Sequence, residues 1–142
     1  MGLYSYNILP TNFCDYLINL YETDTGNHER VDKESKPTFT QLNLNKYHAN
    51  VVSNLCNYFS VALDFYKKDV PQAKYLPQVK YLEEFRIKKY AVGGQDRFDE
   101  HVDVVNHNSS RRCLAMLFYL NDIDSGGKTV FPYQNKEFTP KR

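Results

Sequence analysis

The sequence predicts an α+β fold in which two helices precede a set of antiparallel strands. The first half of the 142-residue chain holds two stretches whose apolar residues recur at three- and four-residue steps, as on one face of a helix. The second half holds short segments of alternating polarity separated by turn residues, which is typical of half-buried strands. One segment, residues 113–120, is apolar throughout, so we expect it to be covered on both sides. These observations predict a sheet sandwich or barrel with the helices packed on one outer face.

Two helices are expected in the first half of the chain. Over residues 12–21, Asn12 can cap the helix and the apolar side chains share one face. A longer helix is expected over residues 46–68, with Asn45 as its cap, and the step into Pro71 ends it. The apolar positions of the longer helix recur at helical spacing: Val52, Leu55, Cys56, Phe59, Leu63 and Tyr66.

The remaining segments are expected to form strands and loops. Residues 23–37 are polar, charged and without periodicity, so we expect a surface loop there. Gly93-Gly94 and residues 121–127 carry the residue types of turns. Strands are expected over residues 39–44, 85–90, 98–105, 113–120 and 129–131, with a last one beginning near Glu137.

The charge balance and the cysteines argue against several classes of protein. Eighteen basic residues against 17 acidic ones leave a net charge of +1, so we expect no nucleic-acid partner. No apolar run approaches the roughly 20 residues that span a bilayer, and the N-terminus lacks the pattern of a secretory signal. We therefore expect a soluble cytoplasmic protein with no membrane partner. Three cysteines without CxxC spacing indicate reduced, buried thiols rather than a zinc site or disulfides: Cys14, Cys56 and Cys113.

The most informative motif for function is His101-Val102-Asp103. Residues two apart on a strand point the same way, so the His101 imidazole and the Asp103 carboxylate are expected to converge. One imidazole and one carboxylate are two of the three ligands of the facial triad that holds non-haem Fe(II) and leaves positions open. A surface pair on an edge strand is the alternative interpretation of the same motif.

Motifs on both sides of this pair favour a metal site over a surface pair. In order along the chain they are Tyr90-Ala-Val-Gly93, Phe98, His101-Val-Asp103, Arg112-Cys-Leu-Ala-Met-Leu-Phe-Tyr119-Leu-Asn121 and Gly126-Gly127-Lys-Thr129-Val-Phe131-Pro132. Together they resemble the prolyl 4-hydroxylase type of 2-oxoglutarate/Fe(II)-dependent dioxygenase. The resemblance covers residues 81–140 and extends more loosely into the helical N-terminal part.

The resemblance implies a fold and a set of site residues. The fold is the double-stranded β-helix, a jelly-roll or cupin-like barrel, with the N-terminal helices packed on its major sheet. The implied iron ligands are His101 and Asp103. The implied cofactor-binding residues are Tyr119, on the distal carboxylate of 2-oxoglutarate, and Tyr90, lining the same pocket. A core aromatic residue is the alternative role for each tyrosine. Arg112 matches a family position, and we expect a structural role for it.

The resemblance also implies an activity. The reaction is oxidative decarboxylation of 2-oxoglutarate coupled to hydroxylation of a C–H bond, with release of succinate and CO2. The implied cofactors are Fe(II), 2-oxoglutarate as cosubstrate and O2, with ascorbate as a candidate addition. The substrate stays open between a peptide or protein and a small molecule, and the oligomeric state stays open as well.

Two elements of the family pattern have no counterpart in this sequence. The only histidine after Asp103 is His107, which follows too closely to be the third ligand, and the basic residue that follows that ligand in the family is missing. Arg86 and Lys88 lie on the face of their expected strand that carries Tyr90. Either could contact an acidic substrate or stand in for the missing basic residue, and solvated surface charges are the alternative.

The expected organisation is one domain with two parts. Residues 1–80 form an N-terminal helical support region, and residues 81–142 form the first half of the jelly-roll core. The second part has room for roughly five of the eight strands of a full barrel, so we expect an incomplete barrel. The chain is then a fragment of a longer enzyme, or a naturally shortened relative that acts as a non-catalytic binding or assembly module or is completed by another chain. We expect weak Fe(II) binding and poor turnover from it.

Overall fold

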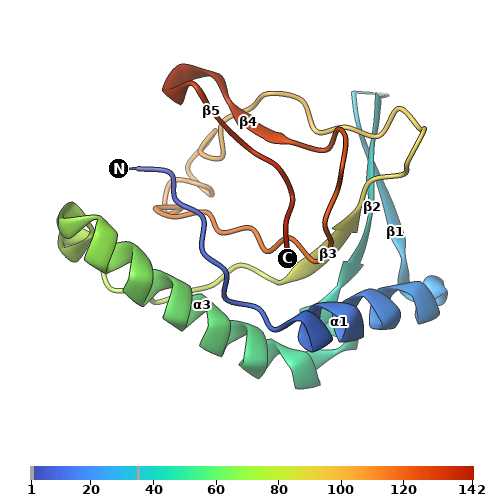
Figure 1. The fold of residues 1–142 in the computed structure, drawn as a ribbon, viewed down its shortest axis with the longest axis horizontal. Coiled ribbons are helices and arrows are strands. Elements are labelled where there is room, and N and C mark those ends of the chain that lie inside the picture. The colour runs from blue at the N-terminus through green and yellow to red at the C-terminus, as the bar shows by residue number, and fades with distance from the viewer. Residues whose placement is uncertain (1, 35) are drawn as a thin grey trace. The chain divides into compact units, whose positions relative to one another are not determined.

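The computed structural model describes residues 2–34 and 36–142. Along the chain lie α1 (Thr11–Thr23), the 3-10 helix η1 (Thr25–Asn27), β1 (Glu29–Lys33), β2 (Lys36–Asn43), α2 (Leu44–Tyr47), α3 (Ala49–Asp69), η2 (Pro71–Tyr75), β3 (Arg86–Lys89), β4 (Thr129–Phe131), η3 (Pro132–Gln134) and β5 (Lys136–Phe138) (Figure 1). The fold is α+β with antiparallel sheets, as expected. The sheets in the described ranges are not closed, so the expected jelly-roll barrel is not confirmed.

The chain forms two compact units. The helical unit comprises Met1–Glu22, Asn54–Gln78 and Met116–Arg142, and the sheet unit comprises Thr23–Ser53 and Val79–Ala115. Each unit therefore draws residues from both sides of position 80. The division expected at that position stays a prediction.

The sheet unit is built on a three-stranded sheet in the order β1-β2-β3 (Figure 1). The central strand β2 pairs on both edges, with Val31 of β1 opposite Phe39 and Ile87 of β3 opposite Leu42. Phe39 and Leu42 are both buried, on opposite faces of β2, because successive side chains of a strand alternate between its two faces. This confirms the strands expected near residues 39–44 and 85–90. The loop expected over 23–37 is wrong in part, since β1 and the start of β2 lie there.

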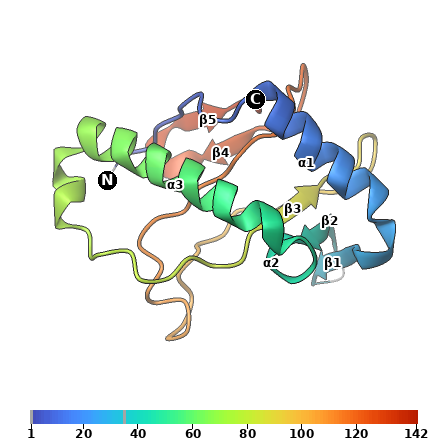
Figure 2. The same ribbon diagram turned by 90° about the horizontal axis from the view of Figure 1, so that it is seen from below.

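The helical unit contains α1 and most of α3, and the rings of Phe13 and Tyr58 lie 5.3 Å apart between them (Figure 2). Both helices were expected from periodicity, and both bury one face. The buried side chains are Cys14, Leu17 and Tyr21 on α1 and Leu55, Ala62 and Tyr66 on α3. In the described ranges, no helix is both long and apolar enough to cross a membrane.

The beginning of the longer helix differs from the expectation. Two helices, α2 and α3, replace the single helix expected over residues 46–68. Asn43, not Asn45, caps α2, since its side chain accepts a hydrogen bond from the Lys46 N–H at 3.1 Å. The side-chain oxygen Oδ1 of Asn45 instead accepts a hydrogen bond from the Phe85 N–H at 2.7 Å, which fixes the chain just before β3.

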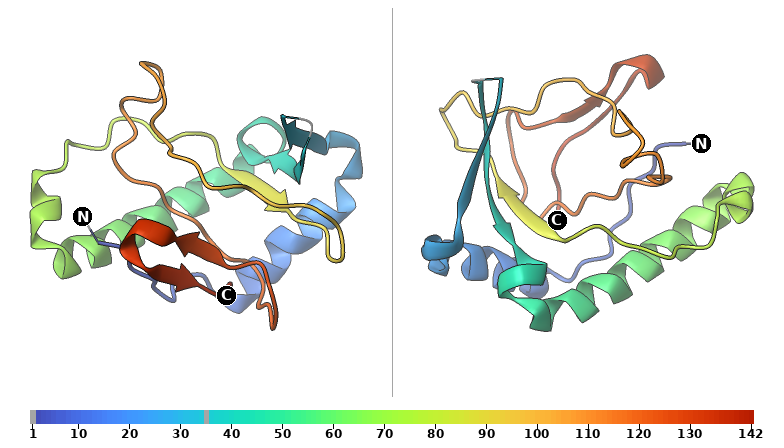
Figure 3. Two further views of the ribbon diagram at one scale, coloured as in Figure 1. Left: turned by 90° about the horizontal axis from the view of Figure 1, so that it is seen from above. Right: turned by 180° about the vertical axis from the view of Figure 1, so that it is seen from behind.

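The last strands form a short hairpin in the helical unit, as expected. β4 and β5 pair antiparallel, with Thr129 opposite Phe138, and η3 joins them (Figure 3). Pro132 ends β4 because proline has no N–H to donate to a ladder. Asn135 completes the turn in the left-handed region, with φ of 49°.

The strands expected over residues 98–105 and 113–120 are wrong. The chain runs without regular strand pairing from the end of β3 to β4 (Figure 1). An extended segment becomes a strand only when its backbone groups meet a partner. In the described ranges the outer edges of β1, β3, β4 and β5 have no ladder partner, so neither segment pairs with any of them. All three cysteine thiols are free, but of the three only Cys14 is buried. The expected burial is wrong for Cys56, which is half-buried, and for Cys113, which is exposed.

Candidate metal centre

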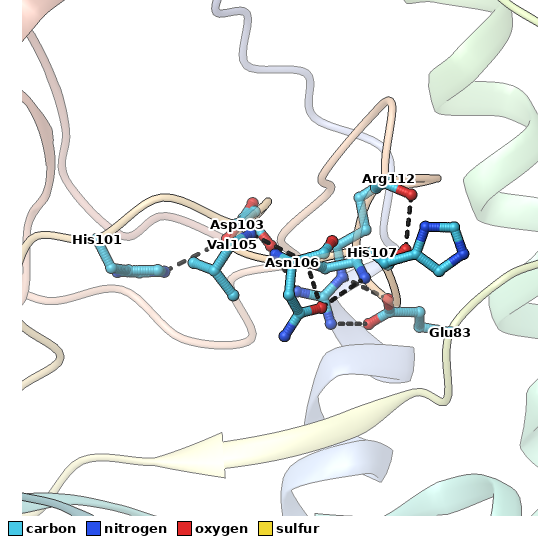
Figure 4. A network of polar contacts seen from close by, with 9 residues as sticks. Glu83, His101, Asp103, Val105, Asn106, His107 and Arg112 are labelled. Atoms are coloured by element: carbon cyan, nitrogen blue, oxygen red, sulfur yellow. Dashed lines mark hydrogen bonds and ion pairs between the residues drawn. The ribbon is translucent and has the colours of Figure 1, made fainter.

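His101 and Asp103 converge in the sheet unit, as the sequence predicts. The His101 Nε2 atom lies 3.3 Å from Asp103 Oδ1, and the side chains are 41% and 51% exposed (Figure 4). The convergence does not come from a strand, because neither residue lies in one. It comes from local contacts of the loop that holds both residues.

The other imidazole nitrogen determines what His101 presents to Asp103. His101 Nδ1 lies 2.9 Å from the Asp99 carbonyl oxygen. A carbonyl oxygen only accepts, so Nδ1 carries the hydrogen and a neutral His101 has its lone pair on Nε2. An ionised carboxylate is also an acceptor, so a lone pair then faces an anion. A proton on Nε2 or a shared cation makes this contact favourable.

The two donor atoms fit one metal ion. Two ligand atoms about 2.1 Å from an ion and roughly at a right angle are about 3.0 Å apart, close to the observed separation. A histidine whose second N–H is held by a carbonyl is the usual arrangement of a metal ligand. Within residues 2–34 and 36–142, no set of three His, Cys, Asp or Glu side chains is placed to hold an ion. One imidazole and one carboxylate match two of the three ligands of a facial triad, and the assignment of His101 and Asp103 as metal ligands stays a prediction.

Arg112 holds the backbone of Asp103 in place. Its Nη1 atom donates to the Asp103 carbonyl oxygen at 2.7 Å, while its Nε and Nη2 atoms donate to the two carboxylate oxygens of Glu83 at 2.5 and 3.1 Å (Figure 4). The hydrogen bonds to Glu83 raise the pKa of the Arg112 guanidinium. These contacts support the structural role expected for Arg112, and no sequence pattern indicated Glu83 as its partner.

His107 does not join the pair. It lies in a tight turn beyond Asp103, where Ser109 accepts hydrogen bonds from the backbone N–H groups of Val105 and Asn106 at 3.0 and 3.1 Å. The His107 carbonyl accepts from the Ser110 hydroxyl at 2.6 Å, and its ring lies on the far side of Arg112 from His101 (Figure 4). His107 is thus a loop histidine, as expected, and its exclusion as a third ligand stays a prediction.

Tyr90 packs beside the core of the sheet unit. Its ring meets the Phe39 ring edge-on at 5.7 Å, and burial of the hydroxyl raises the pKa of Tyr90. The turn after it is fixed by Asp96, which accepts two hydrogen bonds from Arg30 of β1 and one from the Ala91 N–H. The sequence signalled the turn by Gly93-Gly94 but not the ion pair that anchors it.

Tyr119 belongs to the helical unit, where its hydroxyl donates to Thr129 Oγ1 at 2.6 Å. Both residues come from motifs that carry the family resemblance, and here they bond to each other. The assignment of Tyr119 and Tyr90 to a 2-oxoglutarate pocket stays a prediction.

An aromatic ring lies beside His101, and a lysine lies against that ring. The ring of Phe98, one of the motifs that carry the family resemblance, lies 4.1 Å from the imidazole ring of His101, and Lys33 of β1 places its ammonium 4.1 Å from the centre of the Phe98 ring. Lys88, which the sequence did single out, lies 4.5 Å from the Phe39 ring centre. Lys33 lies in a segment expected to be a loop, so no pattern pointed to it.

Known proteins similar to this chain are prolyl 4-hydroxylases. Probable prolyl 4-hydroxylase 9 of Arabidopsis thaliana is 37% identical over 79 residues, which cover 52% of this chain and 26% of that protein. Probable prolyl 4-hydroxylase 3 of the same plant is 26% identical over 148 residues, covering 94% of this chain and 46% of that protein. The human prolyl 4-hydroxylase subunit alpha-1 is 32% identical over 69 residues, covering 42% of this chain and 12% of that protein.

No protein-family model matches the chain, and no solved structure matches it. The chain spans less than half of the length of these curated relatives. Their shared name agrees with the resemblance carried by the HxD motif and the motifs around it. In sequence, the chain resembles the prolyl 4-hydroxylase type of 2-oxoglutarate/Fe(II)-dependent oxygenase.

Proposed function

We propose that this chain contributes two metal ligands, His101 and Asp103, to the site of a 2-oxoglutarate/Fe(II)-dependent hydroxylase. The observation that carries the proposal is the approach of His101 Nε2 to Asp103 Oδ1 at 3.3 Å while the Asp99 carbonyl holds Nδ1. That contact presents one nitrogen and one oxygen donor to the same point. The names of the relatives support the same activity.

The chain's own residues have limited tasks in such a site. Bound Fe(II), with 2-oxoglutarate and O2, would supply the oxidising chemistry that hydroxylates a C–H bond and releases succinate and CO2. His101 would bind through the nitrogen that the Asp99 contact keeps free of hydrogen, and Arg112 would hold Asp103 in position through its carbonyl oxygen. Ascorbate is a candidate addition, as for the family.

The family resemblance supports two tyrosines as candidate cosubstrate ligands, one in each unit. In the sheet unit the candidate is Tyr90, and in the helical unit it is Tyr119, which would donate a hydrogen bond to the distal carboxylate of 2-oxoglutarate. A phenol donates one hydrogen bond, so Tyr119 would have to exchange its bond to Thr129 for the carboxylate. We propose a peptidyl substrate ahead of a small molecule, because the relatives are named for prolyl hydroxylation.

A second candidate function is a non-catalytic binding or assembly module derived from such an enzyme. One observation favours it: within the described residues the pair has no third protein donor beside it. Such a module would need neither His101 nor Asp103 for its ligand.

Metal binding separates the two candidates. We would titrate Fe(II), without oxygen, into the wild-type chain and into His101→Ala and Asp103→Ala, and then add 2-oxoglutarate and measure the heat of binding. A site with two protein ligands should bind weakly, and loss of either ligand should weaken binding by at least about tenfold.

His107→Ala is the matched control, because it removes an imidazole from the same unit without touching the pair. It should bind Fe(II) as the wild-type chain does. If all three variants bind alike, His101 and Asp103 are not ligands, and the non-catalytic candidate is favoured. Circular dichroism of each variant would exclude loss of fold as the cause of a difference.

A further inference from the structure

Lys33 and Lys88 place two ammonium groups against aromatic rings beside His101. The Lys33 ammonium lies 4.1 Å from the Phe98 ring centre, and that of Lys88 lies 5.6 Å from the same ring centre and 4.5 Å from that of Phe39. Cations are attracted to ring faces, and the attraction grows when water is displaced. The Phe98 ring in turn lies 4.1 Å from the His101 ring, so the cluster adjoins the metal-ligand pair.

The positive charge of this cluster is not balanced locally. In the described ranges, Lys36 pairs with Asp99 and Arg30 pairs with Asp96, whereas no carboxylate lies within 4.0 Å of the ammonium of Lys33 or Lys88. Displacement of water by the surrounding groups lowers the pKa of Lys88, and the charges of Arg86 and Lys33 lower it further, while Asp103 acts in the opposite direction. A partly dehydrated ammonium beside a second one is favourable only with an anion nearby.

We propose that Lys88, assisted by Lys33, binds a carboxylate group of a ligand at the edge of the His101–Asp103 pair. A carboxylate accepts charge-assisted hydrogen bonds from both ammonium groups, and the Phe39 and Phe98 rings exclude water from one side of the contact. A metal ion on Asp103 would offset the charge of that carboxylate, so metal binding should strengthen ligand binding at Lys88. In this respect the inference deepens the proposed function, although carboxylate binding at Lys88 does not require a metal.

The carboxylate can come from two sources. One is 2-oxoglutarate itself, with Lys88 in the role of the basic residue that has no counterpart in the sequence. The other is an acidic side chain of a peptidyl substrate. Both sources would present a carboxylate to Lys88. They can be told apart because a change at Lys88 would affect the binding of 2-oxoglutarate in one case and of an acidic peptide in the other.

The test measures carboxylate binding to the full chain without metal. We would follow the ε-carbon resonances of the lysines by NMR while titrating 2-oxoglutarate and, separately, a short prolyl peptide with a neighbouring Glu or with Gln in its place. Lys88→Met keeps the apolar stem and removes the charge, Lys88→Arg restores it, and Lys89→Met is the control, because it removes one charge from the opposite face of β3.

We expect Lys88→Met to weaken binding of one probe by about tenfold or more, Lys88→Arg to recover most of it, and Lys89→Met to change it less than about twofold. A response to 2-oxoglutarate identifies the cosubstrate as the source, and a response confined to the Glu peptide identifies the substrate. Equal affinities in Lys88→Met and Lys89→Met for every probe would overturn the proposal. A different result would contradict the proposed function and leave the carboxylate site intact. Fe(II) binding would then be insensitive to His101→Ala, while carboxylate binding would still depend on Lys88.

Discussion

Asp96 shows how one side chain can fix the loop that precedes a candidate site. Its carboxylate accepts hydrogen bonds from Arg30 Nη1 and Nη2 at 3.1 and 2.7 Å and from the Ala91 N–H at 2.9 Å. The side chain is only 7% exposed. A carboxylate buried to this extent has to be paired, and removal of its partner leaves an uncompensated charge. The turn at Gly93 is therefore tied to β1.

The first prediction concerns the pH dependence of this contact. The Arg30 hydrogen bonds, followed by the Ala91 N–H, lower the pKa of Asp96 below its ordinary value. Its contribution to stability should be complete at neutral pH and be lost as the pH falls below about 4, where the unfolded carboxyl binds a proton before the folded one. Urea unfolding at several pH values would measure it. The wild-type chain should have a higher free energy of unfolding than Asp96→Asn at pH 7, and this difference should shrink as the pH falls to 3.

Asp99→Asn is the control for that series, because Asp99 is an exposed carboxylate of the same segment. Its variant should follow the pH dependence of the wild-type chain closely. If Asp96→Asn also runs parallel to the wild-type chain, the Arg30 contact does not govern the acid sensitivity of the fold.

The sequence correctly predicted that the side chains of His101 and Asp103 converge, but the reason behind the prediction was incomplete. Strand parity predicted that the two side chains converge, and they do, but the Asp99 carbonyl and Arg112 bring this about in a loop. The bond between Tyr119 and Thr129 was not predicted. A contact of this kind depends on tertiary packing, which no pattern of residue types in a single sequence predicts.

At the scale of elements, β2 organises the sheet unit. It is the only described strand with a partner on both edges, and Leu42 in it has no exposed surface. Its side chain faces the core opposite Ile87 of β3. Strand β2 therefore joins the edge strand β1 to β3, the strand that carries Lys88.

The second prediction is that Leu42→Ala destabilises the sheet unit strongly. Truncation of a fully buried leucine removes its transfer free energy and leaves a cavity, which costs about 2–5 kcal/mol. Urea unfolding followed by circular dichroism would measure the loss. Leu82→Ala, at a leucine that is 40% exposed, should cost less than about 1 kcal/mol. Similar midpoints for both variants would show that the core does not lie where the burial of β2 puts it.

Periodicity predicted the elements that bury a face and failed for those that do not. The apolar residues of both main helices recur at helical steps, and β2, β3, β4 and β5 each contain apolar residues among polar ones, so the positions of these elements could be predicted. The edge strand β1 is almost wholly charged, so it has no such pattern and was missed. Residues 98–105 and 113–120 have the composition of strands but no partner in the described ranges. A strand forms only when a second segment pairs with it, and the composition of one segment does not show whether such a partner exists.

At the scale of the whole molecule, the described residues expose seventeen large apolar side chains, which lie in both units. Three of the seventeen follow His101 in the unpaired segment: Val102, Val104 and Val105. Apolar side chains on an extended segment without a ladder partner favour pairing with another chain.

The third prediction follows from this exposure. The chain should associate with itself as its concentration rises, and a single charge in the unpaired segment should suppress the association. Val105 is 69% exposed and lies outside the metal-ligand pair, so Val105→Lys tests the segment without altering His101 or Asp103. Sedimentation velocity over a range of concentrations would measure the shift. Asn108→Lys adds the same charge at an exposed polar position of the same loop, and it should leave association nearly unchanged. If both lysine variants suppress association alike, net charge and not the valine segment controls it.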